Sequence, residues 1–73
     1  MYLSELQNKD IISINNGMNL GRIIDVEINS EGRILNFVAQ EKKFFRKVLK
    51  NSELTFSFND IVKIGKDVIL VNK

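Results

Sequence analysis

Side chains that commonly perform catalysis are scarce in this chain of 73 residues. It contains no histidine and no cysteine, which removes the commonest general bases, nucleophiles and zinc ligands. Ser57 and Asp60 cannot form a triad, because the sequence offers no base to activate the hydroxyl. Asp25 and Glu27 stand two apart on a predicted strand, so both point to one side and could pair or bind a hard cation. No further oxygen ligands follow at close spacing. We therefore interpret the two carboxylates as the solvated face of that strand, and we expect no enzyme, no metal and no cofactor.

The chemically distinctive stretch is EKKFFRKVLKN, residues 41–51. Residues 42–50, here called the basic-apolar segment, carry five positive charges and no acid, so the net charge of +2 leaves −3 for the rest of the chain. The apolar residues recur at i, i+1, i+4 and i+5, the spacing of one stripe on an α-helix, although a helix this short needs a surface to pack on. The candidate partner-binding residues are the apolar Phe44, Phe45, Val48 and Leu49 and the basic Lys42, Lys43, Arg46, Lys47 and Lys50.

The rest of the chain is predicted to form short strands separated by turns, and these strands would hold the basic-apolar segment in place. A capping box at 4–7 predicts a single helical turn near the N-terminus. Glycine-containing turns are predicted at 15–17, 29–32 and 65–67. The strands predicted from the apolar pattern are 10–15, 20–28, 33–40, 53–58, 61–64 and 68–71.

Alternation along these strands predicts which side chains face the core. In the strand 20–28, Ile23 is out of phase, and Gly21 is placed to form a bulge that absorbs part of the mismatch. Asn59 and Asp60 end the strand 53–58 and are candidates to cap one turn of helix. The side chains predicted to face inward are Ile12, Ile14, Leu20, Ile24, Val26, Ile28, Leu35, Phe37, Ala39, Leu54, Phe56 and Phe58.

About six short strands predict a single all-β domain over residues 1–73, a small antiparallel β-barrel, because closure removes the unpaired edges of a sheet. We expect a short helical turn or loop insertion near residues 42–52. A chain of this size buries a marginal core and has no disulfide or zinc to reinforce it, so self-association into a homo-oligomer is expected. No apolar run reaches the roughly 18 residues of a membrane span, and the start MYLSELQNKD lacks the features of a signal peptide. We therefore expect a cytoplasmic protein.

The order of turn and apolar residues resembles the PRC-barrel domain over nearly the whole chain. The C-terminal run FNDIVKIGKDVILV, residues 58–71, is similar to the small stand-alone members in spore-forming bacteria, the YlmC/YmxH sporulation family. The resemblance implies a non-enzymatic module whose relatives act chiefly in protein–protein docking, and for Asp25 it implies a structural hydrogen bond to a turn. The N-terminal residues that carry it are Leu6, Lys9–Ile12, Asn16, Gly17, Leu20–Asp25 and Gly32–Ile34.

Four interpretations of the basic-apolar segment remain open. Its apolar stripe covers an open end of the chain's own barrel, or it is exposed as a docking patch for a protein partner or a second copy. A third interpretation inserts Phe44 and Phe45 into an anionic membrane surface. In the fourth, the segment binds nucleic acid weakly and with strong salt dependence, without the alternate exposed aromatic residues of a stacking sheet.

Docking is our functional hypothesis. The chain would be a sporulation-associated, non-enzymatic scaffold module that binds a protein of unknown identity through residues 42–50, with apolar anchors and basic residues that steer an acidic partner. We do not expect nucleic acid or a membrane surface as the partner. The alternative function is a ribosome- or RNA-associated factor that binds through the same basic segment.

Overall fold

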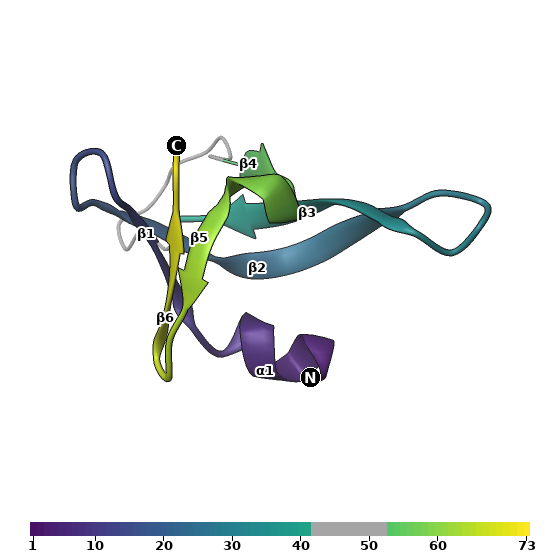
Figure 1. Ribbon diagram of the computed structural model, residues 1–73, viewed down its shortest axis with the longest axis horizontal. Helices are drawn as coiled ribbons and strands as arrows, with labels where there is room; N and C mark the ends of the chain where they lie inside the picture. The colour runs from purple at the N-terminus through teal and green to yellow at the C-terminus, as the bar shows by residue number, and fades with distance from the viewer. Residues whose placement is uncertain (42–52) are drawn as a thin grey trace, which may run out of the picture.

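The computed structural model describes residues 1–41 and 53–73, which form one curved sheet with a short helix beside it (Figure 1). Its six strands lie in the order β4-β3-β2-β1-β6-β5, which confirms the prediction of a mainly β structure with about six strands. The elements are α1 (Leu3–Gln7), β1 (Asp10–Ser13), β2 (Asn19–Ile28), β3 (Ile34–Gln40), β4 (Glu53–Phe56), the 3-10 turn η1 (Phe58–Asp60), β5 (Ile61–Ile64) and β6 (Val68–Val71).

The sheet is mixed and not closed, which corrects the antiparallel barrel predicted from the sequence. β1 runs parallel to β6, whereas the other neighbouring strands are antiparallel. β4 and β5 stand at the two ends of the strand order, and no ladder joins them in the described part of the chain. Turn signals predict the direction of consecutive strands. The β1–β6 pair joins strands from opposite ends of the chain, so no turn signal could predict its direction.

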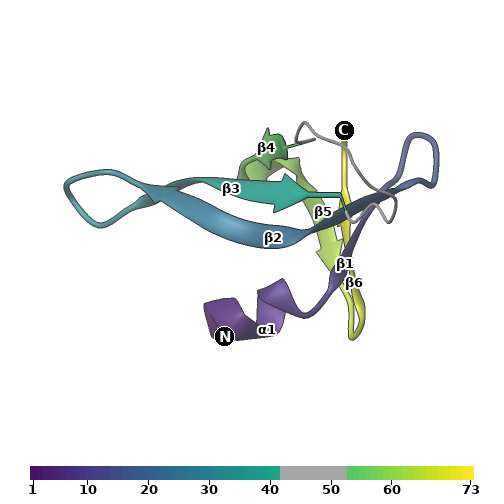
Figure 2. The same cartoon turned by 180° about the vertical axis from the view of Figure 1, so that it is seen from behind.

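The long β2–β3 hairpin crosses the β5–β6 hairpin steeply, as Figures 1 and 2 both show. β2 has 10 residues and pairs with β1 on one side and β3 on the other, so it continues from one half of the sheet into the other. α1 packs against β2, and its N-terminus lies on the side of the β2–β3 hairpin tip. The hairpin therefore extends well past the region where the six strands meet.

Irregular pairing in β2 reverses the faces predicted for two of its isoleucines. The β1–β2 pairing shifts by one residue beside Gly21, where a bulge was predicted. A second shift, in the β2–β3 pairing, leaves Ile24 as an extra residue between Ile23 and Asp25. Each extra residue changes the alternation of side chains between the two faces. As a result Ile23 is buried and Ile24 is 45% exposed, so the inward assignment of Ile24 was wrong.

β1 also buries the face opposite to the predicted one. Ile11 and Ser13 are buried, whereas Ile12 is half-buried and Ile14 is exposed. β1 is a central strand with neighbours on both sides, so both of its faces receive some cover and its apolar residues do not alternate cleanly. The buried Ser13 hydroxyl is satisfied, because it donates to the backbone carbonyl of Lys73 at 2.9 Å.

β4 ends two residues earlier than predicted. Ser57 and Asp60 form a capping box that starts η1, so a helical turn is present, but its cap is Ser57. Phe58 lies in η1 and is exposed, which corrects its inward assignment. Its ring still meets Phe37 edge to face, with the centroids 5.1 Å apart, while the buried Phe56 stacks on Phe37 at 5.4 Å.

α1 begins at Leu3 and lacks the capping box predicted at residues 4–7. Tyr2 occupies the N-cap position and makes no side-chain hydrogen bond there. Leu6 is buried in the core, and this packing holds a helix that is too short to be stable alone. Among the described residues, no helix is long and apolar enough to cross a membrane.

The core is a single cluster that joins α1 to five of the six strands. Its largest side chains are the stacked rings of β3 and β4. Half-buried apolar residues of β2 and β5 pack against it. The buried members are Leu6, Ile11, Ile23, Phe37, Ala39, Phe56, Ile69 and Val71.

Candidate functional site

All nine predicted binding residues, from Lys42 to Lys50, lie outside the described part of the structure. The residues on either side are placed, because Gln40 at the end of β3 pairs directly with Glu53 at the start of β4. Residues 41–52 therefore connect two strands that are already hydrogen-bonded neighbours. A hairpin needs only about two to five connecting residues, so this connection is longer than the fold requires.

A groove of about 530 Å³ lies beside the point where this connection leaves the sheet. The Arg22 guanidinium donates through Nε to Oδ1 of Asp10 at 3.0 Å, and both side chains are about half exposed. The side-chain amides of Asn19 and Gln40 and the carboxylate of Glu41 complete a lining that can form hydrogen bonds but contains no hydroxyl or thiol group. The lining residues are Asp10, Asn19, Gly21, Arg22, Ile24, Gln40 and Glu41.

Backbone crowding shapes the floor of this groove. Gly21 has a φ of +105°, and a Cβ atom added there would lie 2.0 Å from the carbonyl oxygen of Gln40. β2 and β3 can approach so closely only because no side chain stands between them. The close approach fixes the end of β3, and with it the start of the connection that carries the predicted binding residues.

Asp25 and Glu27 make separate local hydrogen bonds. The Asp25 carboxylate accepts from the backbone N–H of Val26 at 2.8 Å, beside the bulge in β2, and Glu27 accepts from the side-chain amide of Asn36 at 2.8 Å. The bond expected for Asp25 therefore lies within its strand and not at a turn. No three His, Cys, Asp or Glu residues gather into a possible metal site within residues 1–41 and 53–73. Both carboxylates are exposed, which agrees with their interpretation as a solvated face.

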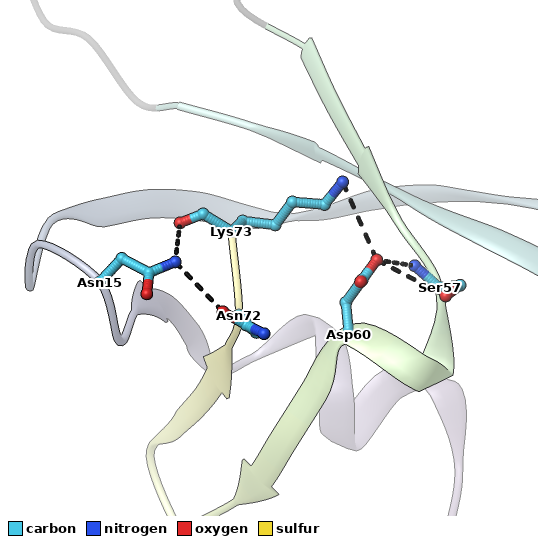
Figure 3. Close-up of polar contacts among 5 residues, drawn as sticks. All are labelled: Asn15, Ser57, Asp60, Asn72 and Lys73. Carbon is cyan, nitrogen blue, oxygen red and sulfur yellow. Dashed lines mark hydrogen bonds and ion pairs between the residues drawn. The ribbon is translucent and has the colours of Figure 1, made fainter.

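Ser57 and Asp60 have a structural role in a polar network at the C-terminal end of the chain (Figure 3). Asp60 accepts from the backbone N–H of Ser57 at 3.0 Å, and its carboxylate lies 3.9 Å from the ammonium group of Lys73. Asn15 donates to the side chain of Asn72 and to the backbone carbonyl of Lys73. These contacts tie β6 to the β1–β2 turn and to η1, so the one Ser–Asp pair considered for catalysis serves the fold.

An apolar surface is exposed on the β2–β3 hairpin, which corrects the inward assignments of Ile28 and Leu35. Ile28 and Ile34 pair across the two strands and are 55% and 39% exposed, and the adjacent Leu35 is exposed as well. The sequence did contain a signal for this surface. The two predicted strands that flank the turn 29–32 are longer than the others, so their far ends have no neighbouring strand to cover them.

Comparison with known proteins agrees with the strand pattern and its turns. The family model described as the PRC-barrel domain matches residues 1–73. A "Probable sporulation protein YlmC" of Bacillus subtilis (strain 168) is 36% identical, over 94% of this chain and 88% of its own length. An uncharacterised protein of Clostridium acetobutylicum is 32% identical, over 96% of this chain and 82% of its own length. The chain belongs to the PRC-barrel family.

Proposed function

We propose that this PRC-barrel protein is a non-catalytic docking module of sporulation, which binds a partner protein through the basic-apolar segment. The name of the Bacillus subtilis relative, a probable sporulation protein, supports the process. The Ser57–Asp60 pair supports a module without catalysis, because it caps a turn and is not part of a catalytic arrangement.

The observation that carries the proposal is the excess length of the connection between β3 and β4. Gln40 and Glu53 are already paired, so residues 41–52 are not needed to bring the strands together. Long connections in compact domains commonly serve binding, since they can change without disturbing the sheet beneath them. In this chain the long connection also carries five positive charges and two adjacent phenylalanines.

The composition of the segment suits a protein partner with an acidic surface. Phe44 and Phe45 supply large apolar anchors, which contribute most of the affinity at interfaces when water is excluded around them. The five basic residues steer the encounter with an acidic partner, an effect that acts on the association rate and weakens with salt. Val48 and Leu49 extend the apolar contact.

Affinity capture from sporulating cells with the full chain as bait tests the proposal. We expect the variant Phe44→Ser with Phe45→Ser to lose specific protein partners that the wild type retains at 0.5 M salt. The control variant Met18→Ser with Val62→Ser removes two apolar side chains that are 55% and 56% exposed elsewhere, and it should retain those partners.

Two results would reject docking through these phenylalanines. One is the same set of captured proteins for the wild type and the Phe44/Phe45 variant. The other is retention of RNA that survives the double substitution and disappears between low and moderate salt, the behaviour of phosphate binding. Nuclease treatment before capture separates RNA-mediated retention from direct protein contact.

A further inference from the structure

The described part of the chain exposes more large apolar side chains than its core contains. Eleven are exposed, whereas the buried cluster has eight members. Scattered exposure of single residues is ordinary, but a contiguous apolar patch on a small domain marks a surface that another molecule covers. Whether the exposed residues indicate an interface therefore depends on whether they lie next to one another.

Three of these residues form a patch at the far end of the β2–β3 hairpin. Ile28 follows Val26 on the face that includes the buried Phe37, because Val26 pairs with Phe37 and Ile28 lies two residues farther along β2. A shift in the pairing sets both Ile34 and Leu35 opposite Ile28. The core face of the sheet thus continues along the hairpin beyond the core.

The N-terminal turn of α1 extends the same patch. Leu3 and Leu6 are three residues apart, so they share one face of the helix, and Leu6 is buried in the core. Leu3 is therefore directed toward β2, one turn closer to the hairpin tip, where α1 has its N-terminus (Figure 1). Tyr2, the preceding N-cap residue, is 75% exposed. Tyr2, Leu3, Ile28, Ile34 and Leu35 are called the hairpin–helix patch.

The size of the hairpin–helix patch matches half of a standard interface. At ~200 Å² for a large side chain, exposures of 38% to 75% give five residues on the order of 500 Å² in one protomer. A standard interface buries ~800 Å² per partner, of which ~65% is apolar in homodimers, again roughly 500 Å². Two copies that meet patch to patch would therefore complete an interface of ordinary size.

A two-fold axis through the patch would set the hairpin of one protomer over the helix of the other, so that the apolar side chains of the hairpin in one copy would meet Tyr2 and Leu3 of its mate.

We propose that the protein is a two-fold symmetric homodimer whose interface is the hairpin–helix patch. The interface covers the apolar end of the hairpin and enlarges a core that is small for a chain without disulfides. The patch and the basic-apolar segment share no residue, so dimerisation and partner docking can be tested by separate substitutions. The dimer would present two copies of that segment to a partner.

The molar mass of the full chain in solution tests this proposal. Light scattering or sedimentation at 5 to 300 µM should show a rise from 8.4 kDa toward about twice that value, with a dissociation constant of about micromolar or lower. Ile28→Glu should keep the mass at 8.4 kDa throughout, because it buries a charge in the interface. Val62→Glu is the matched control, since Val62 on β5 is 56% exposed against 55% for Ile28, and it should leave the dimer intact.

Circular dichroism of both variants checks that the fold is retained, and both positions are exposed in one protomer.

Several outcomes would overturn the homodimer. These are a wild-type mass of 8.4 kDa at 300 µM and equal effects of Ile28→Glu and Val62→Glu. Dissociation by Phe44→Ser with Phe45→Ser would also overturn it, because the interface would then involve the basic-apolar segment. A monomer that uses Ile28 to bind lipid vesicles or another protein would assign the patch to that partner instead.

Discussion

Two glycines with positive φ differ in what surrounds them. Gly21 has a φ of +105° and a backbone carbonyl 2.0 Å from the position of a Cβ atom, whereas Gly32, with a φ of +87°, has nothing within 4 Å. Gly32→Ala should therefore lose about 1–2 kcal/mol of unfolding free energy from the backbone conformation alone. Gly21→Ala should lose at least about 1 kcal/mol more, because β2 and β3 must also separate.

Urea unfolding followed by circular dichroism measures both glycine variants under the same conditions. The informative quantity is the difference between them, since both carry the conformational cost and only one carries the clash. Equal losses would mean that the ends of β2 and β3 separate freely. The groove beside the β3–β4 connection would then lack its fixed floor.

Two serines near the starts of helical turns should differ in their effect on stability. The Ser57 hydroxyl takes part in the capping box that it forms with Asp60 at the start of η1, so Ser57→Ala should cost about 1 kcal/mol. Ser4 lies inside α1 and makes no cap hydrogen bond, so Ser4→Ala should change the unfolding free energy by less than about 0.5 kcal/mol. Thermal unfolding of the pair measures the difference. A larger loss at Ser4 would restore the capping box predicted from the sequence.

At the level of strands, the structure assigns opposite roles to neighbouring isoleucines. Ile11 and Ile23 are buried in the core, while Ile14 and Ile24 are exposed. Ile→Val at either buried position should cost about 0.5–1.5 kcal/mol, because it leaves a methyl-sized cavity, and at either exposed position almost nothing. Chemical unfolding of the four variants measures these costs. The reverse order would support the alternation predicted from the sequence and would reject the bulge at Ile24.

The number of strands and their turns could be predicted from the sequence because these features depend on local residues. Asn29 accepts from the backbone of Glu31 and Arg33, and so closes the β2–β3 turn with contacts inside five residues. The β1–β2 turn at 15–17 is also closed locally, because the Gly17 N–H donates to the backbone carbonyl of Ser13 and the Asn16 side chain accepts from the N–H of Met18. The residues of such turns make the hydrogen bonds that close them, so the positions of the turns were predicted correctly from the sequence.

The faces of several strands could not be predicted, because they depend on pairing between strands, whereas the inward assignments of Phe37, Ala39 and Phe56 were correct. One extra residue at Ile24 moves every later side chain of β2 to the other face. The residue type at position 24 does not indicate that a bulge forms there. Phe58 follows the alternation of β4 perfectly, yet the capping box ends the strand before it. The candidate docking residues were chosen from their composition and helical spacing, and they lie outside the described residues.

At the scale of the whole molecule, the residues that form the core are different from the residues that we propose to bind partners. The core uses α1 and five strands, while the hairpin–helix patch lies at one end and the β3–β4 connection leaves from Gln40 and Glu53. The charges separate in a similar way, with +5 in residues 42–50 and −3 in the rest. Such a separation predicts that the connection can be removed while the sheet stays folded.

Replacing residues 41–52 by Asn-Gly tests this separation directly. Gln40 and Glu53 are already paired, so the two-residue turn closes the same hairpin, and the shorter loop should raise the unfolding free energy by about 1 kcal/mol. Urea unfolding should therefore show a fold at least as stable as the wild type, while affinity capture shows loss of the partner. The full-length variant Phe44→Ser with Phe45→Ser serves as the control and should keep wild-type stability. An unfolded replacement variant, or a destabilised control, would show instead that the phenylalanines belong to the chain's own core, and docking through them would be excluded.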